Sequence, residues 1–218
     1  MERRAALKNI GMVFGYAVAT PTLLGLVQSC KEEALPFAEW APSFFDKENG
    51  VALAQMLDAI LPKTDTPSAT EVNVHVFIDE FAKNVLPKEQ QDFMKILMNK
   101  FMSKVLIDSG KKNLADLESI DFETTLTKYL TKRSEAKEKD HGRALETYQK
   151  AAVTDETAIL DKDIACYEFA ENIRGLATWA YKSSEYIGEE VLAYLPLPGE
   201  YIACTDAEEL TQGRAWSL

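Results

Sequence analysis

The residue types that could hold a metal ion are scarce in this chain of 218 residues, which contains two histidines and three cysteines. Glu138 and His141 stand in a Glu-x-x-His spacing, which places a carboxylate and an imidazole on one helical face, as in di-iron bundles. Such a site needs a second motif of the same kind and two more inward carboxylates. We therefore interpret this single motif as a chance match. The other histidine, His75, we expect to be a packed, hydrogen-bonded core residue.

Motifs for nucleophilic catalysis or cofactor binding are also missing. The chain has no Gly-x-Ser-x-Gly, no glycine-rich nucleotide loop and no Cys-x-x-Cys pair, the local signatures of hydrolases, nucleotide-binding proteins and thiol redox proteins. We therefore expect no catalytic residue, no bound metal and no cofactor in this chain.

The charge of the chain excludes one large class of partner. The formal net charge at pH 7 is −11, and a protein this acidic repels phosphate backbones. Nucleic acid is therefore not an expected partner. At 46% hydrophobic and 27% charged residues, the composition is that of a globular protein.

The N-terminus has the pattern of a targeting segment, with a basic start and then no charge from residue 10 to residue 27. Its start is similar to the twin-arginine export motif, and the matching residues are Arg3, Arg4, Leu7 and Lys8. Ala6 stands where that motif has an aromatic residue. An ordinary secretory signal with two incidental arginines is the alternative. Either way, residues 1–30 predict export and do not belong to the fold.

Cys30 closes this segment and follows Leu26, Val27 and Ser29. The pattern resembles a bacterial lipoprotein cleavage box, in which the cysteine becomes the lipid-bearing first residue. Its acyl chains would hold a periplasmic or envelope-anchored protein on a membrane face. The alternative is cleavage near Ser29 that leaves Cys30 free.

Two further cysteines, Cys166 and Cys204, lie in the mature chain. Export would place them in an oxidising compartment, so they are a candidate disulfide. They could pair with each other or with a partner subunit, or they could be two buried thiols, and the sequence does not choose between these cases.

Apolar residues recur at helical spacing along most of the remaining chain, and no stretch alternates as a strand would. After an extended lead-in over residues 31–45, we expect an all-α fold, a single irregular bundle of six or seven helices over residues 46–218 with an extended C-terminal tail. The expected helices cover residues 47–61, 70–86, 87–108, one from 121, one from 154 or 155 to 182, and one from 183 or 184 to 195. The charged stretch 131–150 is either a solvated helix or a mobile excursion.

The first two expected helices meet at a corner. Pro62 ends the first of them, because it has no N–H to donate and restricts the residue before it. Thr64, Asp65 and Thr66 can each turn a side-chain oxygen onto a nearby backbone N–H, which favours a tight loop.

This corner and four other blocks resemble the gluconate 2-dehydrogenase subunit 3 family. The corner reads ILPKTDTP and is followed by VHVFID. Ala203 stands where the family usually has a glycine before the cysteine. The blocks occur in the same order as in the family, at residues 60–67, 74–79, 179–188, 195–204 and 213–217.

The resemblance implies a partner and a function. Members of the family are small subunits that accompany exported sugar or polyol dehydrogenases. It implies that this chain is a non-catalytic subunit that escorts, stabilises and anchors a large glucose–methanol–choline-type flavoprotein. FAD would sit on that partner, and electrons would pass to a haem protein or a quinone. The rival interpretation is an independent helical envelope lipoprotein that binds a ligand or a protein.

The C-terminal tail is the main candidate for a partner interface, with the corner loop as the second. Its aromatic and proline residues follow no helical period that would bury them, so they either fold back on the bundle or meet a partner. The candidate interface residues are Thr64, Asp65, Thr66, Tyr194, Pro196, Pro198, Tyr201 and Trp216.

Overall fold

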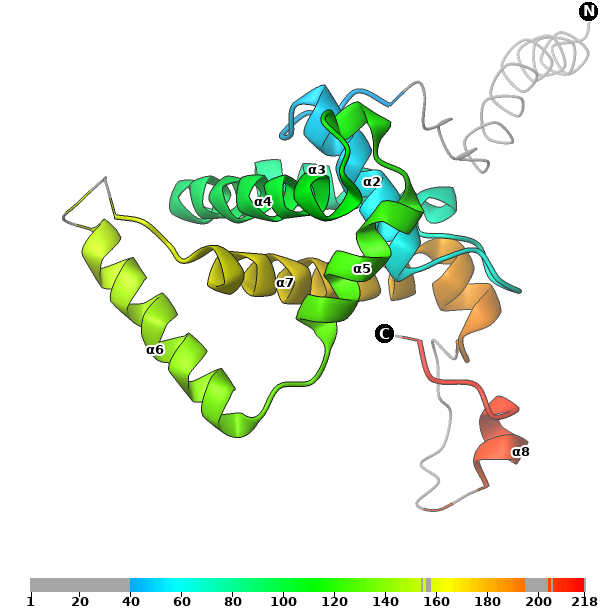
Figure 1. Ribbon diagram of the computed structural model, residues 1–218. Helices are drawn as coiled ribbons and strands as arrows, with labels where there is room; N and C mark the ends of the chain where they lie inside the picture. Colours follow the sequence, from blue (N-terminus) through cyan, green and yellow to red (C-terminus); the bar gives the residue numbers. More distant parts are fainter. Residues whose placement is uncertain (1–39, 154, 156–157, 195–203, 205, 218) are drawn as a thin grey trace, which may run out of the picture. The chain divides into compact units, whose positions relative to one another are not determined.

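The computed structural model describes residues 40–153, 155, 158–194, 204 and 206–217 (Figure 1). These residues are almost entirely helical, with one isolated parallel bridge between Ala193 and Trp216 and no β-strand among them. The predicted all-α fold is confirmed.

Seven α-helices and three short helical turns lie within the described residues. The helices are α2 (Lys47–Ile60), α3 (Val74–Asn84), α4 (Lys88–Ser109), α5 (Ser119–Leu130), α6 (Glu135–Ala152), α7 (Lys162–Lys182) and α8 (Ala207–Thr211). The turns are η1 (Thr70–Val72), η2 (Leu114–Asp116) and η3 (Tyr186–Val191), and η3 has π-type geometry.

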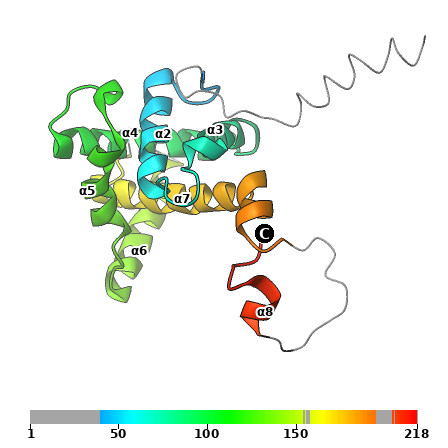
Figure 2. The same ribbon diagram turned by 90° about the vertical axis from the view of Figure 1, so that its right-hand side faces the viewer.

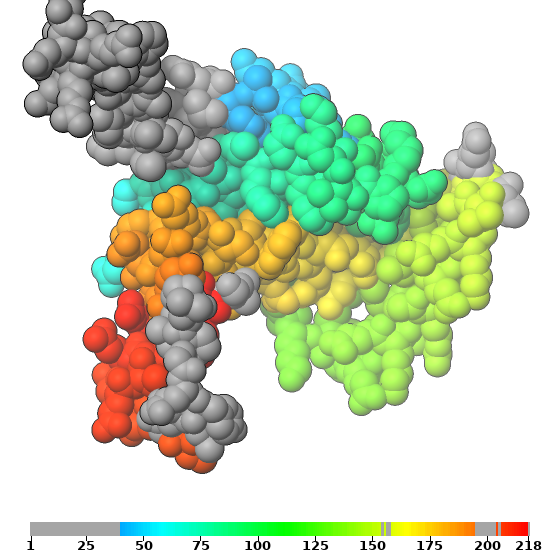
Figure 3. All heavy atoms as spheres, turned by 180° about the vertical axis from the view of Figure 1, so that it is seen from behind, coloured from blue at the N-terminus to red at the C-terminus, as the bar shows by residue number. Residues whose placement is uncertain are grey.

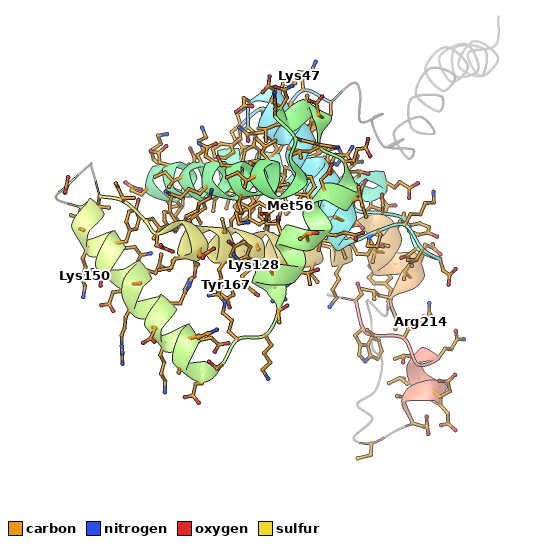
Figure 4. The ribbon with its side chains drawn as sticks, in the orientation of Figure 1. Lys47, Met56, Lys128, Lys150, Tyr167 and Arg214 are labelled. Carbon is orange, nitrogen blue, oxygen red and sulfur yellow. The ribbon has the colours of Figure 1, made fainter. Side chains whose placement is uncertain are left out.

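The core forms where α4 and α7 lie side by side, as Figures 1 and 2 show, with α5 packed against both and α2 packed against α5 and α3. Large side chains fill it, and Phe101 of α4 meets Phe169 of α7 with ring centroids 5.2 Å apart. Met98 and Met102 of α4 lie in this core, because both side chains are buried. Met56 of α2 points into the same interior (Figure 4).

Local signals set the ends of two helices. Asp46 caps α2 by accepting a hydrogen bond from the backbone N–H of Asn49 at 2.9 Å. Leu61 and Pro62 follow directly after its last residue. Gly110 ends α4 with φ at 71°, a left-handed conformation that glycine adopts without steric cost.

The end of the lead-in docks on the helices. Trp40 and Phe45 are buried, and the Trp40 ring stands edge-on to the His75 ring with centroids 4.7 Å apart. Gly50 of α2 lets this segment come close, because a Cβ there would collide with Pro42.

One buried carboxylate fixes the lead-in to α3. Oδ2 of Asp79 accepts hydrogen bonds from the backbone N–H and the hydroxyl of Ser43, at 2.6 and 2.8 Å. Oδ1 of Asp79 accepts from the backbone N–H groups of Phe44 and Phe45, both at 3.0 Å. We call this arrangement the Asp79 clamp. It joins the helical domain to the chain that precedes it.

The structure differs from three of the expected helices and decides one open alternative. The helix expected from residue 183 or 184 to residue 195 is the shorter turn η3. The helix expected over 70–86 is divided at Asn73, whose φ of 58° is a conformation that asparagine tolerates better than most residues. The charged stretch, which could have been a solvated helix or a mobile excursion, is largely helix α6. The helix expected from residue 154 or 155 begins at Lys162, because Asp161 caps it, and Ile159 is 86% exposed.

Candidate functional site

The corner loop, residues 61–68, is held more firmly than its threonines alone predict. Thr64 Oγ1 lies 3.4 Å from the backbone N of Thr66, a long contact that contributes little. Glu71 does more, because its carboxylate pairs with Lys63 and accepts the backbone N–H of Ser68 at 2.9 Å. The loop is therefore closed by a carboxylate that lies beyond it.

The same end of the loop is tied back to α2. Asp58 accepts the backbone N–H of Thr70 at 2.9 Å and its hydroxyl at 2.7 Å. The backbone N–H of Ala69 donates to the carbonyl of Leu61 at 3.0 Å. These bonds hold the corner in one conformation.

Tyr181 connects the corner loop to the last turn of α7. Its hydroxyl donates to the carbonyl oxygen of Pro67 at 2.7 Å and lies 3.0 Å from Oγ1 of Thr66. The structure therefore brings together the corner and the end of α7, two blocks that the sequence singled out separately.

We expect replacement of Tyr181 by phenylalanine to lower the free energy of unfolding by about 1 kcal/mol, the net effect of one lost hydrogen bond. Denaturant unfolding measures it. Tyr148→Phe is the matched control, because the Tyr148 ring stacks on Phe93 and its hydroxyl makes no hydrogen bond within the described residues. Equal losses in the two variants would contradict the assigned role of the Tyr181 hydroxyl.

Three aromatic rings meet at the surface between α3 and α7. Trp179 is 45% exposed, and its ring lies edge-on to Phe77 and Phe81 with centroids 5.1 and 5.7 Å away. Phe77 and Phe81 stack on each other at 5.9 Å. We call these three residues the aromatic patch. The sequence pattern did not show that Trp179 and the two phenylalanines meet at the surface.

The end of the described chain is bound to the segment after α7. The backbone N–H of Ala193 donates to the carbonyl of Ala215 at 2.8 Å, and that of Ser217 donates to the carbonyl of Ala193 at 3.0 Å. Arg214, labelled in Figure 4, donates to the carbonyl of Glu190 at 3.4 Å. Part of the tail thus folds back, while the side chains of Tyr194 and Trp216 are still exposed.

Several predicted site residues lie outside the described residues. They are Arg3, Arg4, Leu7, Lys8, Cys30, Pro196, Pro198 and Tyr201. Export, lipidation and the central part of the tail interface therefore stay predictions.

The two cysteines differ in environment, and both thiols are free in this structure. Cys166 is buried in α7, where its Sγ lies 3.7 Å from the carbonyl oxygen of Lys100, and burial raises its pKa. Cys204 is exposed. The pairing of these cysteines stays a prediction, and a bond to another subunit would use Cys204, the accessible thiol.

His141 is a structural residue that joins α6 to α7. Its Nε2 lies 2.8 Å from a carboxylate oxygen of Glu168, and its Nδ1 lies 3.3 Å from Arg133. Tyr167 completes the cluster, with its ring edge-on to the imidazole and beneath the Arg133 guanidinium (Figure 4). No group of three or more potential metal ligands occurs among the described residues. Glu138 takes no part in this cluster.

These features define a helical domain with exposed aromatic side chains near a rigid corner. The chain belongs to the gluconate 2-dehydrogenase subunit 3 family, whose model matches residues 47–199. The name of the family describes its members as a subunit of gluconate 2-dehydrogenase. No curated protein and no solved structure gives a significant match to the chain. Within the described residues, no helix is both long enough and apolar enough to cross a membrane.

Proposed function

We propose that this chain is a non-catalytic small subunit that escorts, stabilises and anchors a large dehydrogenase subunit in the cell envelope. Family membership gives the class of complex. One structural observation carries the proposal, the exposure of Trp179 beside Phe77 and Phe81 at the surface between α3 and α7.

Exposed aromatic residues in contact with one another are unfavourable in water and are enriched in the centres of protein interfaces. Because α3 packs against α7 and Tyr181 of α7 holds the corner loop, the patch sits on elements with a defined geometry. A pre-ordered surface loses less conformational entropy when a partner binds.

The proposed complex divides the work between its subunits. The large subunit is a glucose–methanol–choline-type flavoprotein that binds FAD and oxidises a sugar or a sugar acid. Electrons then pass to a haem protein or a quinone. This chain supplies the export signal through Arg3, Arg4, Leu7 and Lys8, and a lipid on Cys30 holds the complex on the membrane. In this complex, the present chain contributes binding surface and no redox group.

Affinity purification of the tagged full-length chain from its native envelope tests this function. We expect a large polypeptide to co-purify, with flavin absorbance and sugar- or sugar-acid-dependent reduction of a dye. Trp179→Ala should reduce the retained flavin about tenfold or more, since buried aromatic anchors dominate binding energy.

The control is Ile107→Ala, which removes an apolar side chain that is 67% exposed on α4. It should leave the retained flavin unchanged. Recovery of the wild-type chain with no flavoprotein would overturn the proposal and favour the independent envelope lipoprotein.

A further inference from the structure

The exposed face of α7 carries a glycine one helical turn before Trp179. Gly175 is exposed, and a Cβ built on it would meet nothing within 4 Å. Glycine is among the poorest helix formers, so an alanine would suit the isolated chain better. Residues four apart share a helical face. Gly175 therefore exposes backbone on the face of α7 that also carries Trp179.

After the end of α7, the side chain of Tyr186 in η3 is also exposed, at 52%. Figure 3 shows the orange atoms of the segment from the end of α7 to η3 between the teal atoms of α3 and the red atoms of α8. We call Gly175, Trp179 and Tyr186 the α7 ridge. Its two aromatic side chains offer large contact areas, and its glycine lets another backbone approach closely.

Acidic side chains predominate in the described chain after α7. Glu185, Glu189 and Glu190 are exposed, and none of them forms an ion pair within the described residues. From Lys182 to Arg214, the described residues include two basic side chains, Lys182 and Arg214. The acidic ones are Glu185, Glu189, Glu190, Asp206, Glu208 and Glu209.

We propose that the α7 ridge docks on a surface of the large subunit that is apolar at its centre and basic at its rim, with partner backbone against Gly175. This rests on the proposed function and specifies the chemistry of the partner. Charge complementarity favours a partner surface with a basic rim, because opposite potentials favour encounter and like charges disfavour it. An anionic lipid surface or a second acidic copy of this chain would meet repulsion.

Gly175→Ala gives the sharpest test, because it should stabilise the free chain but weaken its complex with the large subunit. The free chain should melt about 2–4 °C higher, owing to better helix propensity. The flavin retained after affinity purification should fall about tenfold, because the new methyl group occupies the space of the partner backbone. A higher melting temperature with unchanged flavin retention would overturn the close approach at Gly175.

A charge-reversal pair tests the basic rim. The flavin retained by the wild type should decrease as salt is raised in the wash, since screening weakens surface attraction. Glu189→Lys with Glu190→Lys should lower retention at low salt about tenfold and flatten that salt dependence. Glu123→Lys with Glu146→Lys is the matched control, because it makes the same charge change on exposed residues of α5 and α6.

The other possible results of these experiments also test the α7 ridge and its basic partner rim. If both charge-reversal pairs lower retention equally, the attraction depends on net charge and the proposed rim is wrong. If the wild type retains flavoprotein and neither Gly175→Ala nor the Glu189/Glu190 pair weakens it, the α7 ridge is not the interface and the proposed function still stands. Self-association of the free full-length chain that Glu189→Lys/Glu190→Lys strengthens, or a preference of the unlipidated chain for anionic over neutral vesicles, would assign the ridge to another occupant.

Discussion

Replacing Asp79 with alanine is expected to lower the free energy of unfolding by about 3 kcal/mol, a large share of the stability of an ordinary domain. The Asp79 carboxylate is 1% exposed and accepts four hydrogen bonds from Ser43, Phe44 and Phe45. Hydrogen bonds to a charged group contribute about 1.5–3 kcal/mol each, but water can replace those near the exposed Ser43. The N–H of buried Phe45 has no such replacement, so it dominates the loss.

In the Asp79→Ala variant, the segment that the clamp holds should open before the whole domain unfolds. Without the Asp79 clamp, Trp40 and Phe45 lose the bonds that hold their backbone, so this segment should open while α4 and α7 stay packed. Hydrogen exchange of the Phe44 and Phe45 amides should accelerate more than that of core amides such as Phe101.

Denaturant unfolding measures the stability change, and Asp92→Ala is the control. Asp92 pairs with Lys88 at an exposed i,i+4 position, where an ion pair contributes about 0.5 kcal/mol or less. If Asp79→Ala costs no more than Asp92→Ala, or if the Phe44 and Phe45 amides keep their protection, the clamp does not hold the lead-in.

The Asp79 clamp also has a mechanical consequence for the proposed anchor. A pull on the chain that precedes Trp40 would reach α3 first through Trp40, which packs on His75, and then through the clamp on Asp79 of the same helix. Phe77 and Phe81 of the aromatic patch lie on the same helix. An anchored N-terminus and a docked partner would therefore share one rigid element.

Features set by neighbouring residues could be predicted from the sequence. Asp46 and Pro62 bound α2, and Gly110 ends α4, because capping, proline geometry and left-handed glycine act within a few residues. Where two local signals compete, the pattern was insufficient. Ile159 fits the apolar period of α7, but the cap at Asp161 starts the helix after it.

Features set by distant residues could not be predicted in this way. The Asp79 clamp joins residues about 35 positions apart, and Tyr181 bonds to Pro67 across 114 positions. His141 illustrates the limit, because its spacing from Glu138 is visible in the sequence while its real partner, Glu168, lies 27 positions away. A single sequence shows the period of a helix but not which residue of another helix faces it.

Lowering the pH from about 7 to about 4.5 is expected to remove roughly 2.5 kcal/mol of stability through His75 alone. His75 is fully buried, and desolvation lowers its pKa from 6.5 to about 4, against the opposing pull of Asp58 and Asp79. In the unfolded chain it titrates near its ordinary pKa, so the unfolded state takes up a proton first as the pH falls. The contribution of His75 is thus complete above about pH 6.5 and declines toward about pH 4.

The aspartates whose pKa values are lowered act in a different pH window. The pKa values of Asp108, Asp121 and Asp163 are lowered from 3.8 by hydrogen bonds and lysines. Their stabilisation is present above that ordinary pKa and is lost only as the pH falls through their still lower folded values. Between about pH 6.5 and about pH 4.5, these carboxylates therefore change stability little.

His75→Gln supplies the comparison, since a buried amide does not titrate. Its unfolding free energy should be lower than that of the wild type at neutral pH but nearly flat down to about pH 4.5, so the two stability curves converge on acidification. Urea unfolding across this range measures both curves, and the imidazole pKa can be followed directly by NMR, because the chain has only two histidines. Parallel curves, or a His75 imidazole that titrates near 6.5, would show that burial does not keep this side chain neutral, and that the packing of Trp40 against it tolerates a charge.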